Sequence, residues 1–450
     1  MKELKVLYGK TIRKVLFSIV FSTTILLFSS CKNDITVSST NNKNAVMDAQ
    51  HLSGQQKGYK LKQVVVLSRH NVRSPLGNSG SEIDNLTPHK WFDWTSKQSQ
   101  LSIRGGVLET EMGQYFRKWF EREKLFSENY DPKNIDVLTD EVRIYANSKQ
   151  RTLATANYFL TGLFPVSDLD VEHHMEYDTM DPVFNPVLTN IDDEFIKVAL
   201  EQMKEMSLAK VSKLKPNYDL IESVVDVKES KDYKEGKFTG FKTVDDQFIL
   251  ENNKEPVVKG SLKKACLLSD ALTAQYYECS DDVAAFGKKI SYEDWEKISE
   301  VKDVYEDVLF TAPIVATNVA KPLLTEMLKE INNENRKFTF LCGHDSNVDS
   351  VLAALNVNEY FLPLAIERKT PIGCKIVVST WTKDDDKTNG EYMSIDMMYQ
   401  SVDQLRGIEM LDEKNPPAIY KLSFKELNGN DDGYFRKDDV VKLFEGAIAK

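Results

Sequence analysis

A histidine between two arginines is the stretch of this sequence whose chemistry is most specific. Arg69-His70-Asn71-Val72-Arg73-Ser74-Pro75 places one imidazole among two guanidinium groups. A guanidinium keeps its charge and offers planar, bidentate donors, which suit a phosphate dianion. An imidazole in that setting can itself attack phosphorus and form a phosphohistidine. The stretch therefore predicts a phosphoryl-transfer site, with a chance grouping of exposed charges as the alternative.

Two further stretches carry groups that the same chemistry needs. In Gly343-His344-Asp345-Ser346-Asn347, His344 can donate to a phosphate oxygen. Asp345, when protonated, can give a proton to a departing alkoxide, which leaves poorly without one. Arg151 can supply a third guanidinium to the same phosphate. Taken alone, Asp345 could be only a helix N-cap, and Arg151 only a solvated helix residue.

Each of these stretches follows a segment whose apolar or β-branched residues predict a strand. We expect strands at 63–68, 142–146, 337–342, 375–381 and 392–399, and helices at 101–123, 152–164 and 347–355. Strands that alternate with helices predict an α/β fold with a mostly parallel central sheet flanked by helices. Ligands of such sheets bind at the carboxyl ends of the strands, so the three stretches should meet there.

The chain of 450 residues is long enough for two or three domains. Residues 166–304 are rich in helical patterns and in charge, and we interpret them as an inserted, mainly α-helical cap domain. Residues 59–165 and 305–450 would then form the α/β catalytic domain.

The N-terminus has the pattern of a targeting segment. Lys10, Arg13 and Lys14 precede an uncharged run of 14 residues, Val15–Phe28. This run is shorter than the ~20 residues of a membrane-spanning helix and is typical of a signal peptide.

The run ends in Leu-Phe-Ser-Ser-Cys, which resembles a bacterial lipoprotein cleavage site with Cys31 as the lipidated residue. We therefore expect residues 1–30 to be a lipoprotein signal peptide and residues 31–58 a flexible tether. The mature protein would be exported to the periplasm or the outer membrane and would contact a membrane only through this anchor. The alternative is an ordinary secretory signal cut nearby.

Composition narrows the choice of partners. The formal net charge of -11 argues against a global basic surface for nucleic acid. An exported protein could pair its other cysteines as disulfides, and Cys266 and Cys279 are the pair close in sequence. The adjacent His173 and His174 and the loop at 428–439 are weak metal signals, so we expect neither a metal nor another cofactor.

The two motifs at 69–75 and 344–347 resemble those of the histidine acid phosphatases, the branch of the histidine phosphatase superfamily that includes phytases. Asn71 directly follows the histidine, and the glucose-1-phosphatase-like subgroup also has an asparagine at this position. The sequence also resembles that subgroup at residues 101–109, 146–152, 179–186 and 370–373. The resemblance implies a phosphoglycerate mutase-like α/β domain and an α-helical cap, with the site in the cleft between them.

The resemblance also implies roles for individual residues. It makes His70 the nucleophile and Asp345 the proton donor. It implies that the phosphoryl group is bound by Arg69, Arg73, Arg151 and His344. Leu76 matches a leucine that narrows the pocket in the glucose-1-phosphatase-like subgroup, and Glu255 matches a cap glutamate that contacts sugar hydroxyls.

We therefore expect a metal-independent acid phosphatase that hydrolyses small phosphorylated sugars such as glucose 1-phosphate and works best at acidic pH. One alternative is a phytase that acts on inositol hexakisphosphate. An alternative of another class is a lipoprotein that binds phosphorylated glycans without turnover. The sequence leaves the choice between a monomer and a homodimer open.

Overall fold

The computed structural model describes residues 58–77, 82–126, 135–383 and 390–450. The predicted signal peptide, Cys31 and all of the predicted tether except residue 58 lie outside these residues. The described residues all belong to one compact unit of the chain, Lys43–Lys450.

A seven-stranded sheet forms the centre of the described chain, in the order β2-β5-β1-β6-β7-β8, with β9 also paired to β7. The strands are β1 (Tyr59–Arg69), β2 (Val142–Ala146), β5 (Phe338–Gly343), β6 (Lys375–Lys383), β7 (Glu391–Tyr399), β8 (Ala418–Lys421) and β9 (Phe435–Arg436). Strands β2, β5 and β1 are parallel, whereas β6 is antiparallel to β1, and β7 is antiparallel to β6, β8 and β9.

The predicted α/β fold is confirmed, but the sheet is mixed, so the prediction of a mostly parallel sheet is wrong in this respect. Only seven residues separate β6 from β7. A connection that short can join antiparallel strands but cannot make the crossover that parallel strands need. The parallel part is the half of the sheet that carries the three chemical stretches.

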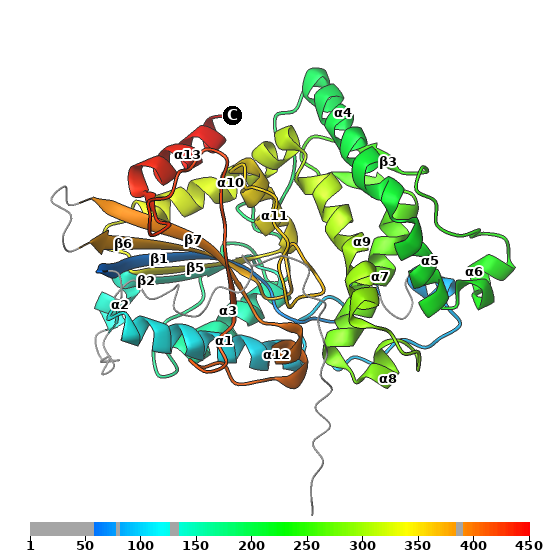
Figure 1. The fold of residues 1–450 in the computed structure, drawn as a ribbon, viewed down its shortest axis with the longest axis horizontal. Coiled ribbons are helices and arrows are strands. Elements are labelled where there is room, and N and C mark those ends of the chain that lie inside the picture. Colours follow the sequence, from blue (N-terminus) through cyan, green and yellow to red (C-terminus); the bar gives the residue numbers. More distant parts are fainter. Residues whose placement is uncertain (1–57, 78–81, 127–134, 384–389) are drawn as a thin grey trace, which may run out of the picture. The chain divides into compact units, whose positions relative to one another are not determined.

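Helices cover both faces of this sheet (Figure 1). One face packs against α1 (Ile103–Arg122), α2 (Ile135–Glu141) and α3 (Gln150–Leu163), and the other against α10 (Pro313–Ile331), α11 (Asp345–Ala354) and α13 (Lys437–Ala449). Alternate residues of β1 serve the two faces: Val64 and Val66 join the first core, and Val65 and Leu67 the second. This alternation follows from the two-residue period of a strand and explains why the run Val64–Leu67 of β1 is apolar without interruption.

A third hydrophobic core lies among the remaining helices. The larger ones are α4 (Asp193–Lys210), α5 (Lys215–Val224), α7 (Ser261–Glu278) and α9 (Tyr292–Phe310). The shorter elements are α6 (Lys231–Lys234), α8 (Asp281–Ala284), α12 (Val402–Gly407), the hairpin of β3 (Gln247–Ile249) and β4 (Val257–Lys259), and three 3-10 turns, η3 (Glu82–Leu86), η4 (Val211–Lys213) and η5 (Val227–Glu229). Helix α9 runs across residues 304 and 305, where we expected a domain boundary.

Helix α7 also decides the question of the cysteines. Cys266 lies within it and Cys279 caps its C-terminus, and both are unpaired, as are Cys342 and Cys374. Thirteen residues of α-helix span about 20 Å, far more than the ~7 Å that a disulfide tolerates between Cα atoms. The pairing that sequence proximity suggested is therefore excluded by the helix.

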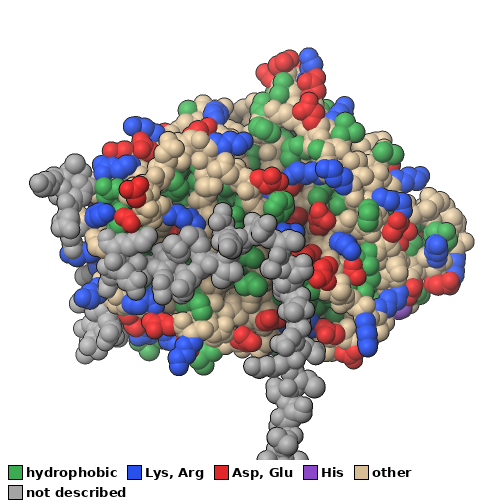
Figure 2. Space-filling view, in the orientation of Figure 1, with side chains coloured by type: hydrophobic (Ala, Val, Ile, Leu, Met, Phe, Trp, Pro, Cys, Tyr) green, Lys and Arg blue, Asp and Glu red, His purple; other side chains and the backbone are tan. Residues whose placement is uncertain are grey.

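The surface carries both signs of charge. On the face shown in Figure 2, Lys and Arg side chains are interspersed with Asp and Glu side chains. Among the described residues, no single helix has the length and apolar content that crossing a membrane requires; α9 and α10 meet that criterion only as a pair, with an 86° bend between them.

Candidate active site

The carboxyl ends of three neighbouring strands bring the predicted residues together. Strand β5 lies between β1 and β2, with Arg69 opposite Gly343 and Ala146 opposite Cys342. The residues that follow continue this pairing, because the His70 N–H donates to the Gly343 carbonyl at 3.0 Å. The Asn147 N–H likewise donates to the Cys342 carbonyl at 2.9 Å. All three stretches therefore meet at one edge of the sheet.

His70 is buried and its ring is held by its own loop. Nδ1 lies 3.0 Å from the backbone oxygen of Asn71. Because a carbonyl can only accept, Nδ1 carries the hydrogen and Nε2 keeps a free lone pair. Burial and the charges of Arg151 and Arg73 hold the pKa of His70 well below its usual value. The lowered pKa favours the neutral imidazole, the form that can act as a nucleophile.

His344 faces His70, with ring centroids 5.6 Å apart. Its Nε2 lies 2.7 Å from Nδ2 of Asn147, which donates to it. The other ring nitrogen, Nδ1, lies 3.3 Å from Nη2 of Arg151, which can only donate. Burial and the charge of Arg151 keep the pKa of His344 well below its usual value. The lowered pKa favours a neutral imidazole at His344, beside Arg151 and facing His70.

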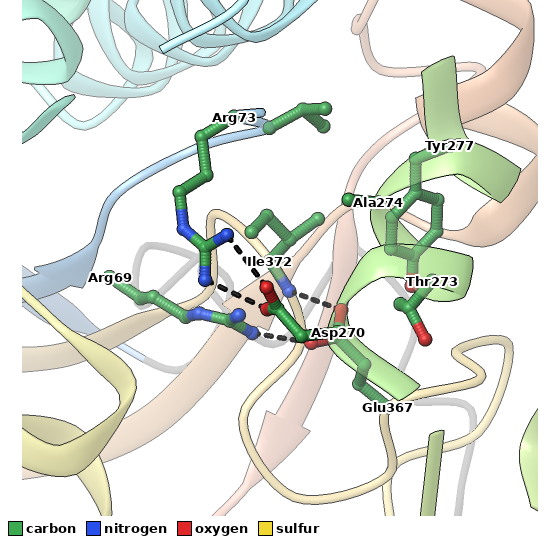
Figure 3. A pocket seen from close by; sticks show the side chains of 9 residues that line it. Arg69, Arg73, Asp270, Thr273, Ala274, Tyr277, Glu367 and Ile372 are labelled. Carbon is green, nitrogen blue, oxygen red and sulfur yellow. Dashed lines mark hydrogen bonds and ion pairs between the residues drawn. The ribbon is translucent and has the colours of Figure 1, made fainter. Parts of the chain in front are cut away.

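The two arginines of the first motif are each held by a carboxylate (Figure 3). Arg73 makes a bidentate pair with Asp270 on α7, with N–O distances of 2.8 and 3.0 Å. Arg69 donates to Glu367 Oε1 at 2.7 Å and to the carbonyl of Thr370. Such pairs fix the planar groups in one orientation. Both guanidinium groups are therefore preset for a ligand rather than mobile.

Arg151 is the exception among these guanidinium groups. Among the described residues, no carboxylate lies within ion-pair distance of it, and its Nε is buried without a hydrogen-bond partner. Burial and the charge of Arg73 lower the pKa of Arg151 to about 10. A buried cation without an anion is costly, and a phosphate dianion beside Arg151 would remove that cost.

Asp345 is the first residue of α11, and His344, not Asp345, is the N-cap. The alternative that Asp345 serves only as an N-cap is therefore wrong. Its Oδ2 contacts Lys302 Nζ on α9 and lies 3.3 Å from Arg69 Nη2. Burial alone would raise the pKa of Asp345, but these two cations bring it well below its usual value.

A buried ion pair supports the loop that carries His70. Asn71 Nδ2 donates to Glu109 Oε2 at 2.8 Å, and Glu109 Oε1 pairs with Lys375 Nζ at 2.9 Å, both fully buried. Gly373 approaches so closely that a Cβ there would lie 2.7 Å from Asn71 Nδ2, and its φ of +70° also favours glycine. The Gly373 N–H donates to the His70 carbonyl at 3.1 Å. Asn71 therefore ties the loop that carries His70 to Glu109 of α1, and through Glu109 to Lys375 of β6.

Leu76 and Glu255, the two predicted pocket residues, both lie near the site, but their contacts with it differ. Leu76 is 42 % exposed, and its N–H donates to Asp270 Oδ2 at 3.1 Å, so the carboxylate that holds Arg73 also holds Leu76. Glu255 is accessible to solvent. Partial desolvation raises the pKa of Glu255, and Arg151 lies close enough for its charge to lower it.

Sequence reasoning missed the residues that hold the reacting groups: Asp270, Glu367, Lys302, Glu109 and Lys375. For Asp270, a signal was present, because a carboxylate interrupts the apolar run Ala265–Leu272 of a helix. Glu109 lies at the end of the stretch 101–109 and also on a buried helix face. Nothing local marked Glu367 or Lys302, whose partners lie far away in sequence.

Comparison with known proteins identifies relatives over most of the chain. The model of the histidine phosphatase superfamily (branch 2) matches residues 60–399. Glucose-1-phosphatase of Providencia rettgeri is 38% identical over 393 residues, which are 86% of this chain and 92% of the relative. Glucose-1-phosphatase of Salmonella typhimurium is 38% identical over 87% of this chain and 93% of the relative.

A phytase of Escherichia coli is more distant, at 24% identity over 81% of this chain and 86% of the relative. Among solved structures, a Hafnia alvei phytase superposes with a TM-score of 0.77 at 23% identity, over 87% of this chain and 98% of the other. This likeness concerns the fold. The family model and the relatives at 38% identity show that the chain belongs to branch 2 of the histidine phosphatase superfamily.

Proposed function

We propose that this protein hydrolyses phosphate monoesters of small sugars, such as glucose 1-phosphate, through a phosphohistidine on His70. The observation that carries the proposal is a neutral, buried imidazole with its Nε2 lone pair free, set among Arg69, Arg73, Arg151 and His344. The relatives at 38% identity are named glucose-1-phosphatases, which supports this substrate class.

In the first step, Nε2 of His70 attacks phosphorus and the bond from phosphorus to the ester oxygen breaks. Asp345, in its protonated form, gives its proton to that oxygen, so that a neutral sugar hydroxyl leaves. The transition state is loose and spreads charge over the equatorial oxygens. The three guanidinium groups and His344 stabilise that charge, with Arg69 and Arg73 fixed in orientation by their carboxylate partners.

In the second step, the oxygen of a water molecule attacks the phosphohistidine and the P–N bond breaks. Asp345, now a carboxylate, takes the proton from this water, and His70 returns to its neutral form. The cycle therefore restores both residues. Inorganic phosphate is the second product.

The electrostatics of the two residues support acidic operation. His70 stays neutral as the pH falls because its pKa is well below the usual value. Asp345 becomes protonated only as the pH falls towards its own lowered pKa. The fraction of enzyme with a neutral nucleophile and a protonated acid therefore grows on the acidic side.

The choice of a small substrate rests on Leu76 and Glu255. Leu76 donates its N–H to Asp270, the carboxylate that holds Arg73, and its side chain would limit the width of the entrance. Glu255 is accessible, and its carboxylate can accept hydrogen bonds from sugar hydroxyls. A carboxylate at the entrance would also repel the many phosphates of inositol hexakisphosphate. Both features favour a sugar monophosphate over phytate.

The test compares wild type with His70→Ala on glucose 1-phosphate, phytate and an aryl phosphate, with a chelator present. We expect hydrolysis by the wild type, a higher kcat/KM for glucose 1-phosphate than for phytate, and a radiolabelled phosphoprotein after acid-free quenching. His70→Ala should lose turnover and labelling, whereas the matched control His173→Ala, at an exposed site, should keep both.

Labelling and substantial turnover that persist in a folded His70→Ala would contradict the proposal. Faster hydrolysis of phytate than of glucose 1-phosphate would favour a phytase instead. Binding of sugar phosphates without any turnover would favour the non-catalytic lipoprotein.

We also propose the domain division and the export that the sequence predicts. Residues 166–304 would form a cap between the two parts of the α/β domain, and their helices supply most of a separate hydrophobic core in support of this. Export and a lipid on Cys31 can be tested by cell fractionation and by detergent extraction, with Cys31→Ser as the comparison. A variant that stays as firmly in the membrane fraction as the wild type would contradict the lipid anchor.

A further inference from the structure

A lysine that the proposed reaction does not use contacts its proton donor. Lys302 lies on α9, is 5% exposed, and its Nζ contacts Asp345 Oδ2. The same oxygen faces Arg69 Nη2 at 3.3 Å, while Oδ1 accepts the N–H of Ser346 at 3.1 Å. Oδ2, the oxygen of Asp345 that makes no hydrogen bond to the backbone of α11, thus faces two cations, Lys302 and Arg69.

The other charged groups around Asp345 do not neutralise the effect of these two cations on its carboxylate. The titratable and charged groups that face it come from several elements: Lys302, Tyr305 and Glu306 of α9, Arg69 and His70 after β1, Arg151 of α3, His344 and Asp349 around α11, and Glu255 of the loop before β4.

Burial disfavours the charged forms of two acidic members of this group, Glu306 and Asp349. It raises the pKa values of Glu306 and Asp349 well above the usual range and so favours their neutral forms. Burial would lower the pKa of Lys302, but facing carboxylates, Asp345 first among them, raise it overall. Lys302 therefore stays charged, and its main anionic contact is Asp345.

We propose that Lys302 is a positioning residue that, through its direct ion pair with Asp345 Oδ2, sets the pH range in which Asp345 can give its proton to the leaving oxygen. The inference rests on the proposed function and deepens it. A cation in contact with a carboxylate stabilises its ionised form. Lys302 therefore hinders the first step, which needs a proton on Asp345, and helps the second step, which needs the carboxylate.

The sign of the effect follows from these two requirements. Removal of the Lys302 charge lets Asp345 hold its proton to higher pH. The activity on alkyl esters, whose leaving oxygen needs that proton, should then extend towards neutral pH. The second step should become slower, so that the phosphohistidine accumulates and a burst precedes the steady state.

The experiment measures kcat/KM for glucose 1-phosphate and for an aryl phosphate from acidic to neutral pH. The aryl leaving group departs without full protonation, so the ratio of the two values isolates the proton donor and cancels the ionisation that the phosphates share. The variants are Lys302→Met, which removes the charge, and Lys302→Arg, which keeps it. Lys297→Met, at an exposed lysine of the same helix, is the matched control.

In the wild type, the ratio should rise as the pH falls and should titrate below the ordinary aspartate value of about 3.9. In Lys302→Met, the titration should move up by about 1–3 pH units, the usual effect of one contacting opposite charge. Lys302→Arg and Lys297→Met should keep the wild-type titration. The amplitude of the burst of the released phenol should be larger in Lys302→Met than in the wild type.

A uniform loss of activity in folded Lys302→Met, with no shift of the ratio, would overturn the inference and leave Lys302 as a structural residue. If Lys302→Met does not fold, the wild-type titration still decides, because a midpoint above about 3.9 would contradict the inference. Failure of the proposed function would instead appear as turnover by His70→Ala, whatever the result with Lys302.

Discussion

The sheet edge and the helices α7 and α9 contribute to the site in different ways. The residues proposed to react or to bind phosphate follow the ends of β1, β2 and β5, where backbone hydrogen bonds between adjacent strands fix them. The helices instead reach in with long side chains: Asp270 holds Arg73, and Lys302 holds Asp345.

The sheet edge therefore supplies the groups proposed to react, and the helices supply side chains that orient these groups or change their charge. Parallel strands can place three loops at one edge with little freedom, because the register of the strands is fixed by many hydrogen bonds. A side chain from a helix can change charge or length without disturbing that register. We therefore expect substitutions at the sheet edge to abolish activity, and substitutions on the helices to change orientation, pH dependence or stability.

The largest effect should come from Asp345, the proposed proton donor at the sheet edge. Asp345→Asn keeps the shape but cannot donate an acidic proton, so kcat for glucose 1-phosphate should fall by about 10²- to 10⁴-fold. The loss on an aryl phosphate should be much smaller, because its leaving oxygen needs little protonation. Equal losses on both substrates, measured side by side in steady state, would assign Asp345 a role in binding instead.

Next in size is a pair of variants at two phosphate-binding arginines, of which Arg73 is held by a carboxylate of α7 and Arg151 is not. Arg73→Met and Arg151→Met should each lower kcat/KM by about 10²- to 10³-fold, since each removes a donor to the transition state. Only Arg73→Met leaves a buried carboxylate, Asp270, without its partner, and it should lose about 3–5 kcal/mol of stability.

Urea denaturation of both proteins checks this contrast. Arg151→Met should be at least as stable as the wild type, because Arg151 has no carboxylate within ion-pair distance among the described residues. Similar destabilisation of the two variants would remove the distinction between preset and free guanidinium groups.

A smaller effect is expected at the buried contacts that support the loop carrying His70. Glu109→Gln leaves the buried charge of Lys375 unpaired and should lower the free energy of unfolding by about 3 kcal/mol or more. Asn71→Gly removes one hydrogen bond to Glu109 and should cost about 1–3 kcal/mol. Urea titration of the two variants should give this order, and the reverse order would mean that the amide, not the ion pair, holds the loop.

The smallest expected effect concerns substrate choice. Leu76→Ala widens the entrance at a side chain that is 42 % exposed. A methylene in an enclosed pocket is worth about tenfold or more in discrimination, so the change in the ratio of kcat/KM for glucose 1-phosphate to that for phytate should stay below this. An unchanged ratio would show that Leu76 does not limit the entrance.

Most of the elements around the site were predictable from local pattern. The strands expected at 63–68, 142–146, 337–342, 375–381 and 392–399 are β1, β2, β5, β6 and β7, and the helices expected at 101–123, 152–164 and 347–355 are α1, α3 and α11. The apolar periodicity of each segment explains this agreement. The direction of β6 was missed because strand direction depends on the connection between strands and not on the pattern within one.

By itself, the sequence determined which groups are available: an imidazole among permanent cations, a carboxyl group beside a second histidine, and the strand that precedes each. Residue type and local spacing suffice for that. Only the tertiary structure decided which charges are in contact, because Arg73 and Asp270 are 197 residues apart and Lys302 and Asp345 are 43 apart. Burial then makes these distant pairs strong enough to set orientation and protonation, and burial is a property of the packed chain.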